Sequence, residues 1–115
     1  MAKIAFVGGG SYLWMPSILG RLLQAPAFQN DRIVIVDLDA RAAEDIYQLG
    51  AALKRRFKSG LAITQTANLD EALDGADYVA LTISTGGLEA MRVDLDVPEK
   101  FGIYHTVGDT VGPGG

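Results

Sequence analysis

The sequence has no cysteine and only one histidine, His105, among its 115 residues. Disulfide bonds are therefore excluded, and the thiolate and imidazole ligands that transition metals prefer are almost missing. A single histidine in a loop is more typical of a surface or packing residue than of a metal ligand. We therefore predict no metal site within this chain.

Long apolar runs and long basic runs are missing too. No apolar stretch approaches the ~20 residues of a membrane-spanning helix, and no charged segment followed by an apolar one marks a signal peptide. The net charge is −4, and the densest basic stretch, residues 54–58, is interpreted as the solvated end of a helix. We expect a soluble cytoplasmic protein with a small-molecule ligand and without a nucleic-acid or membrane partner.

Residues 3–11, KIAFVGGGS, organise the rest of the sequence. The apolar run 4–7 is typical of a strand buried on both faces, and it leads directly into Gly8, Gly9 and Gly10. A buried strand, a glycine-rich turn and a helix open a dinucleotide-binding βαβ unit, in which backbone N–H groups approach a pyrophosphate. Leu13 occupies the third glycine of the G-x-G-x-x-G pattern, so we expect the helix to lie farther from the strand. The alternative is an ordinary glycine-rich turn.

The second predicted strand, residues 32–37, ends in an acidic residue, Asp37. A carboxylate at this position hydrogen-bonds the hydroxyl groups of the adenosine ribose in dinucleotide-binding folds. Because it would repel a 2′-phosphate, it favours NAD over NADP, although the nearby Arg41 moderates this preference. The alternative role for Asp37 is that of a residue capping the next helix.

The remaining sequence alternates between strand and helix patterns. We predict strands at 4–7, 32–37, 61–66 and 77–84, a helix from Pro16 that Pro26 ends, a loop at 27–31, and helices at 40–59, 68–73 and 88–101, the last broken near Pro98. Gly60 is the expected C-cap of the second helix. Asn68 is the expected N-cap of the third helix, with Glu71 as its capping-box partner.

This order predicts an α/β fold of the Rossmann type, with helices on both faces of a parallel sheet in the order 3-2-1-4. Residues 8–11 and 84–87 then lie at the carboxyl ends of the first and fourth strands, where ligands bind. The length and the hydrophobic content of 49% fit one NAD(P)-binding domain covering residues 1–115. Because the sheet is incomplete and the chain stops in a glycine-rich loop, we expect the N-terminal portion of a longer enzyme.

Three segments together resemble glycoside hydrolase family 4, the NAD- and metal-dependent glycosidases: KIAFVGGGSYLWMP, TISTGGLEAMRVDLDVPEKFGI and VGDTVGPGG. The resemblance spans the chain. It implies that NAD⁺ removes hydride from C3 of the sugar, a base removes the C2 proton while Mn²⁺ or another divalent metal stabilises the enediolate, the aglycone leaves, water adds and the hydride returns. It also implies a homodimer or homotetramer, and metal ligands and a catalytic tyrosine outside this chain.

The resemblance assigns roles to particular residues. It places Gly8, Gly10 and Ser11 at the pyrophosphate, Asp37 at the adenosine ribose, and Ser84 and Thr85 near the nicotinamide ribose. Asp109 falls where many members carry a glutamate that tunes the catalytic tyrosine; its alternative role is that of a turn residue.

Arg92 partly matches a substrate-binding arginine of the phospho-glycosidases in the family, but Met91 takes that place when the segments are matched at Pro98. The sequence from 97 to 115 looks closer to members that act on unphosphorylated glycosides or on uronic-acid glycosides. Two rival functions are a fragment of a lactate/malate dehydrogenase-like oxidoreductase and a non-catalytic remnant of the fold. We expect this chain alone to lack glycosidase activity.

Overall fold

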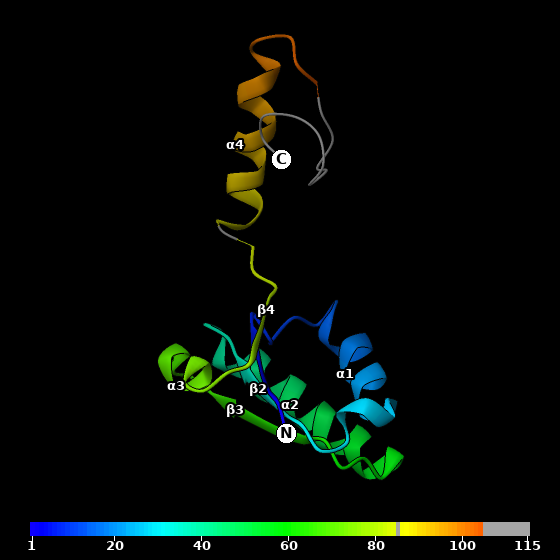
Figure 1. Ribbon diagram of the computed structural model, residues 1–115. Coiled ribbons are helices and arrows are strands. Elements are labelled where there is room, and N and C mark those ends of the chain that lie inside the picture. Colours follow the sequence, from blue (N-terminus) through cyan, green and yellow to red (C-terminus); the bar gives the residue numbers. More distant parts are fainter. Residues whose placement is uncertain (85, 105–115) are drawn as a thin grey trace. The chain divides into compact units, whose positions relative to one another are not determined.

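The computed structural model describes residues 1–84 and 86–104 (Figure 1). The chain divides into two compact units, Met1–Ile83 and Ser84–Gly115. The first unit contains a sheet with its helices, and the described part of the second contains one long helix. In the part of the chain that the structure describes, no helix is both long and apolar enough to cross a membrane.

The first unit is built on a four-stranded parallel sheet in the order β3-β2-β1-β4. The strands are β1 Lys3–Val7, β2 Arg32–Val36, β3 Ala62–Thr66 and β4 Tyr78–Leu81. The predicted fold class and strand order are confirmed. β4 ends at Leu81, earlier than predicted, because β1 turns away after Val7 and leaves the following residues without a strand to pair with.

Helices cover both faces of this sheet (Figure 1). They are α1 Met15–Gln24, α2 Ala40–Phe57 and α3 Leu69–Leu73. The residues 27–31, predicted as a loop, include part of a 3₁₀ helix at Pro26–Phe28, since Pro26 fits the first position of a helical turn.

The burial of β2 shows how the sheet acquires two covered faces. Ile33 and Ile35 belong to the main core with residues of α1 and α2, whereas Val34 and Val36 pack with Ala72 of α3. Successive residues of a strand point to opposite faces, so four consecutive aliphatic residues are buried only when both faces are covered. This strand fixes the parallel, doubly covered architecture.

The cap predicted at Gly60 is wrong. α2 ends at Phe57, and Lys58 adopts the left-handed conformation at φ 52° while its N–H donates to carbonyl oxygens of the last turn. Gly60 is needed for another reason, since a Cβ there would lie 2.4 Å from the carbonyl oxygen of Gln29. Close approach between two loops, not helix termination, accounts for this glycine.

The cap predicted for α3 is half right. The Asn68 side chain accepts hydrogen bonds from the N–H groups of Asp70 and Glu71, as expected of an N-cap. The capping box is absent, because the Glu71 carboxylate accepts from the Thr66 hydroxyl at 2.7 Å and the Asn68 N–H donates to the Thr66 hydroxyl at 3.1 Å. Thr66 at the end of β3 thus competes successfully for both groups.

The second unit contributes α4, Gly87–Glu99. The helix runs through Pro98 and ends one residue later, with Lys100 as its C-cap. Proline removes one backbone donor and crowds the preceding turn, so it is tolerated here in the final turn. The predicted break is therefore the end of the helix.

Candidate dinucleotide-binding site

The strand register brings the glycine turn and Asp37 together. Val7 and Val36 are paired at the ends of β1 and β2, so Gly8 and Asp37 leave the sheet side by side. The N–H groups of Gly8 and Gly9 both donate to the carbonyl oxygen of Val36, at 3.0 and 3.1 Å. The glycine turn therefore folds over the end of the neighbouring strand.

The Asp37 carboxylate lies at the centre of this edge. One oxygen accepts from the N–H of Gly10 at 2.9 Å, and the other accepts from the N–H of Asp39 at 2.9 Å. The N-cap of α2 is Asp39, whose carboxylate accepts from the N–H groups of Arg41 and Ala42. The alternative role of Asp37 as the helix cap is thus wrong, and Asp37 joins the glycine turn to the approach of α2.

Each of the three glycines stands where a side chain would collide. Gly8 has φ +84°, and a Cβ would lie 2.0 Å from the carbonyl oxygen of Thr82. At Gly9 a Cβ would lie 2.8 Å from Ile35, and at Gly10 it would lie 2.9 Å from the Asp37 carboxylate. Glycine is required by close approach at all three positions and by backbone conformation at Gly8.

Thr82 is a site residue that the sequence analysis missed. Its N–H donates to the carbonyl oxygen of Val7 at 2.8 Å, and its hydroxyl donates to the carbonyl oxygen of Gly8 at 3.1 Å. The only signal in the sequence was a threonine within an otherwise apolar strand pattern. Thr82 holds the start of the glycine turn against the segment that follows β4.

The turn between Ser11 and α1 offers hydrogen-bond donors. The Ser11 Oγ accepts from the N–H of Trp14 at 3.2 Å, and the Ser11 N–H donates to the Gly8 carbonyl oxygen at 3.3 Å. Within the described ranges, the N–H groups of Tyr12 and Leu13 make no hydrogen bond. Backbone donors just before a helix bind anions readily.

Leu13, which replaces the third glycine, is 78% exposed and precedes the first residue of α1. Its side chain therefore points to solvent and does not lie between the helix and the strand. The expected larger separation between helix and strand stays a prediction.

Tyr12 links the same turn to α2. Its hydroxyl donates to the Asp45 carboxylate at 3.0 Å. This hydrogen bond, with a smaller contribution from desolvation, raises the pKa of Tyr12 above its ordinary value. The protonated phenol is therefore the form that holds the turn.

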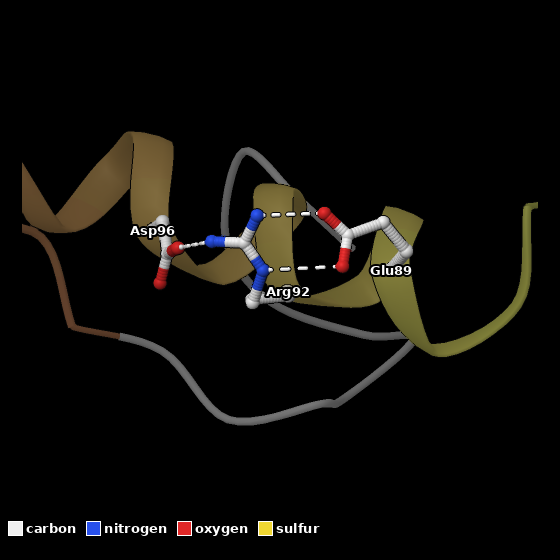
Figure 2. A network of polar contacts seen from close by, with 3 residues as sticks. All are labelled: Glu89, Arg92 and Asp96. Carbon is white, nitrogen blue, oxygen red and sulfur yellow. Dashed lines mark hydrogen bonds and ion pairs between the residues drawn. The ribbon is translucent and has the colours of Figure 1, made fainter.

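Arg92 makes ion pairs within α4 (Figure 2). Its guanidinium lies 2.6 Å from the Glu89 carboxylate, with two hydrogen bonds, and 2.7 Å from the Asp96 carboxylate. The hydrogen bond from Arg92 lowers the pKa of Glu89, and that same bond is the main reason why the pKa of Arg92 is raised. The side chain is 60% exposed and satisfied by its own helix.

The other predicted site residues belong to the second unit. Ser84 is exposed, whereas Thr85, His105 and Asp109 lie outside the described residues. The described residues contain no group of three or more His, Cys, Asp or Glu side chains that could hold a metal ion. The structure thus joins Gly8, Gly10, Ser11 and Asp37 into one site.

The family model described as family 4 glycosyl hydrolase matches residues 3–115. The chain belongs to this family. The resemblance seen in the sequence is confirmed, and the lactate/malate dehydrogenase-like alternative is wrong.

The curated relatives that the chain matches include alpha-galacturonidases. The protein from Lachnoclostridium phytofermentans is 39% identical over 98% of this chain and 24% of its own length. The alpha-galacturonidase of Bacillus subtilis is 37% identical over 98% of this chain and 24% of its own length. The chain thus spans about a quarter of the length of the curated relatives that it matches.

Solved structures agree with the fold. The crystal structure of lplD from Bacillus subtilis matches with a TM-score of 0.78 and 37% identity, over 99% of this chain and 25% of that one. A 6-phospho-alpha-glucosidase from gut microorganisms, solved in complex with NAD and Mn²⁺, matches with a TM-score of 0.74 and 26% identity, over 98% of this chain and 26% of that one.

Proposed function

We propose that this chain is the NAD-binding part of a family 4 glycosidase that acts on unphosphorylated uronic-acid glycosides. The observation that carries the cofactor assignment is the Asp37 carboxylate, which two backbone N–H groups hold beside the glycine turn. A carboxylate in this position accepts hydrogen bonds from ribose hydroxyls and disfavours a 2′-phosphate. NAD is therefore the cofactor that this edge of the sheet fits.

The residues of the turn fit a pyrophosphate in two different ways. Gly8 and Gly10 contribute by lacking a Cβ, since their N–H groups already donate to protein oxygens. The donors left for phosphate oxygens are the N–H groups of Tyr12 and Leu13, and the Ser11 hydroxyl adds its own proton. Tyr12 was not assigned this role from the sequence.

The relatives favour the substrate class. Alpha-galacturonidases match at 37–39% identity, whereas the 6-phospho-alpha-glucosidase matches at 26%. Arg92, the residue that partly matches a phosphate-binding arginine, is occupied by two carboxylates in α4. A substrate role for Arg92 would therefore require its guanidinium to exchange Glu89 or Asp96 for a negatively charged group of the sugar.

The family membership sets the chemistry of the complete enzyme in this proposal. A bound nicotinamide supplies reversible hydride exchange at the sugar C3, and a divalent metal supplies charge stabilisation at the neighbouring enediolate. Within this chain, Ser84 and Thr85 would contact the nicotinamide ribose, and Asp109 would tune the base. We further propose a cytoplasmic homo-oligomer and an isolated chain without glycosidase activity.

The test is a calorimetric titration of the chain with NAD⁺ and NADP⁺. We expect saturable NAD⁺ binding, weaker binding of NADP⁺, and about tenfold weaker NAD⁺ binding in Asp37→Ala, because charge-assisted contacts are lost. Asp74→Asn removes a carboxylate from an exposed position near the amino ends of the strands and should bind NAD⁺ as the unchanged chain does. A folded chain that binds no NAD⁺ would leave two interpretations, a non-catalytic remnant or a domain that needs further strands to bind the cofactor.

A further inference from the structure

Positive charge is concentrated at the C-terminal end of α2. Four of the ten basic residues of the chain lie there, in a molecule of net charge −4: Lys54, Arg55, Arg56 and Lys58. The helix macrodipole places only about half a negative elementary charge at this end of the helix, which offsets a small part of these four positive charges. Among the described residues, ion pairs are formed by Arg92 alone. The end of α2 therefore keeps an excess of positive charge.

Three of these cations line a hollow of about 530 Å³ between α2 and β3. The cations are Lys54, Arg55 and Lys58. The apolar part of the wall consists of Tyr47, Ala51 and Ile63. The volume is in the range of small-molecule sites, and the wall carries as many charged side chains as apolar ones, which suits a charged ligand.

The rim of this hollow is held in place by contacts from a distant loop. Ser59, which lines the hollow, is 7% exposed, and its hydroxyl donates to the Gln29 Oε1 at 3.0 Å. The N–H of Gly60 donates to the same oxygen at 2.7 Å. Lys58 stands in the left-handed conformation between this anchor and the helix. A rim that is ordered in advance loses little conformational freedom when a ligand binds.

We propose that this hollow is a binding site for a small anion with several negative charges, either the carboxylates of an acidic sugar or a phosphate. Lys54, Arg55 and Lys58 bind the charges, and the ring of Tyr47 provides a face for an apolar surface of the ligand. The hollow lies near the start of β3, whereas the glycine turn lies at the carboxyl end of β1. The site is separate from the dinucleotide site, and the proposal does not rest on the proposed function.

The test is a titration of the ¹⁵N-labelled chain, followed by backbone amide chemical shifts, with trigalacturonate and separately with inorganic phosphate. We expect saturable shifts at residues 54–59 with at least one probe, weakened by added salt. The double variant Lys54→Gln/Lys58→Gln should bind about tenfold more weakly, because two charge-assisted contacts are lost. Saturation by trigalacturonate alone identifies an acidic-sugar site, and saturation by phosphate alone identifies a phosphate site.

Arg56→Gln is the matched control, since Arg56 lies in the same helical turn but does not line the hollow. It removes one charge and should leave the affinity within about twofold, as expected of an exposed charge without a contact. Two outcomes overturn the proposal. One is the absence of saturable shifts at 54–59 with both probes, and the other is an equal loss per charge in the control and the double variant, which indicates diffuse attraction. The double variant should bind NAD⁺ as the unchanged chain does, measured by calorimetry. Its anion binding and its cofactor binding are therefore tested independently.

Discussion

Asp37 and Arg92 are both charged residues with a predicted binding role, yet different kinds of contact hold them. The Asp37 carboxylate accepts hydrogen bonds from the N–H group of Gly10, which is far away in the sequence, and from the N–H group of Asp39. Among the described residues, Arg92 forms its ion pairs with residues one helical turn away, Glu89 and Asp96. Contacts across the sheet fix a site, because they depend on several elements packing together. Contacts within one exposed helix stabilise that helix and fix nothing beyond it.

The largest effect on stability is expected from a side chain placed in the glycine turn. Gly8→Ala puts a Cβ 2.0 Å from the Thr82 carbonyl oxygen at a positive φ. We expect the free energy of unfolding to fall by about 3 kcal/mol or more, from overpacking and backbone strain together. Chemical denaturation followed by circular dichroism measures this loss.

The control for that variant lies in α1. A Cβ at Gly20 meets nothing within 4 Å, so Gly20→Ala should raise the free energy of unfolding by about 1 kcal/mol, the helix-propensity difference. A Gly8→Ala variant as stable as the unchanged chain would contradict the close packing of the turn against Thr82.

The second prediction removes the carboxylate that joins the two loops. Asp37→Ala leaves the N–H groups of Gly10 and Asp39 without their acceptor, and we expect a loss of about 2 kcal/mol in the free energy of unfolding. Urea denaturation at neutral pH measures it, and hydrogen exchange should show faster exchange of the Gly10 amide. A slowly exchanging Gly10 amide in the variant would show that Asp37 does not hold the turn.

The third prediction concerns Tyr12, which joins the glycine turn to α2 through Asp45. Its pKa is raised because the protonated phenol donates to this carboxylate, so the hydrogen bond is complete below the ordinary tyrosine pKa and is lost as pH rises through the raised value. Asp45→Asn should lower the pKa of Tyr12, as seen in an absorbance titration of tyrosinate. Since the chain has other tyrosines, Tyr12→Phe identifies the transition that belongs to Tyr12.

The smallest effect is expected in α4. The pKa of Glu89 is lowered by Arg92, so this pair favours the helix above the ordinary glutamate pKa and is lost as pH falls through the lowered value. Circular dichroism should show a small loss of helix on acidification that Arg92→Gln reduces. A large drop in the global stability of Arg92→Gln would mean that Arg92 has contacts beyond its own helix.

Local patterns in the sequence were sufficient to predict the architecture. Four consecutive aliphatic residues in β2, an apolar run before three glycines, and short connections between them leave a parallel sheet with β1 in the centre. These features are local periodicities, and the handedness of crossovers then restricts the topology to one order. The family could also be predicted from the sequence, because motifs at both ends of the chain are typical of it.

The hydrogen-bond partners of the polar groups depend on how the elements pack in three dimensions. Asp37 could cap a helix or hold a loop, and the register of β1 against β2 selects the loop. Lys3, a terminal residue of an apolar strand, is 8% exposed and donates to the carbonyl oxygens of Glu71 and Asp74 at the end of α3. A polar group binds whichever partner packing brings within hydrogen-bond distance, and that partner is not encoded in its sequence neighbours.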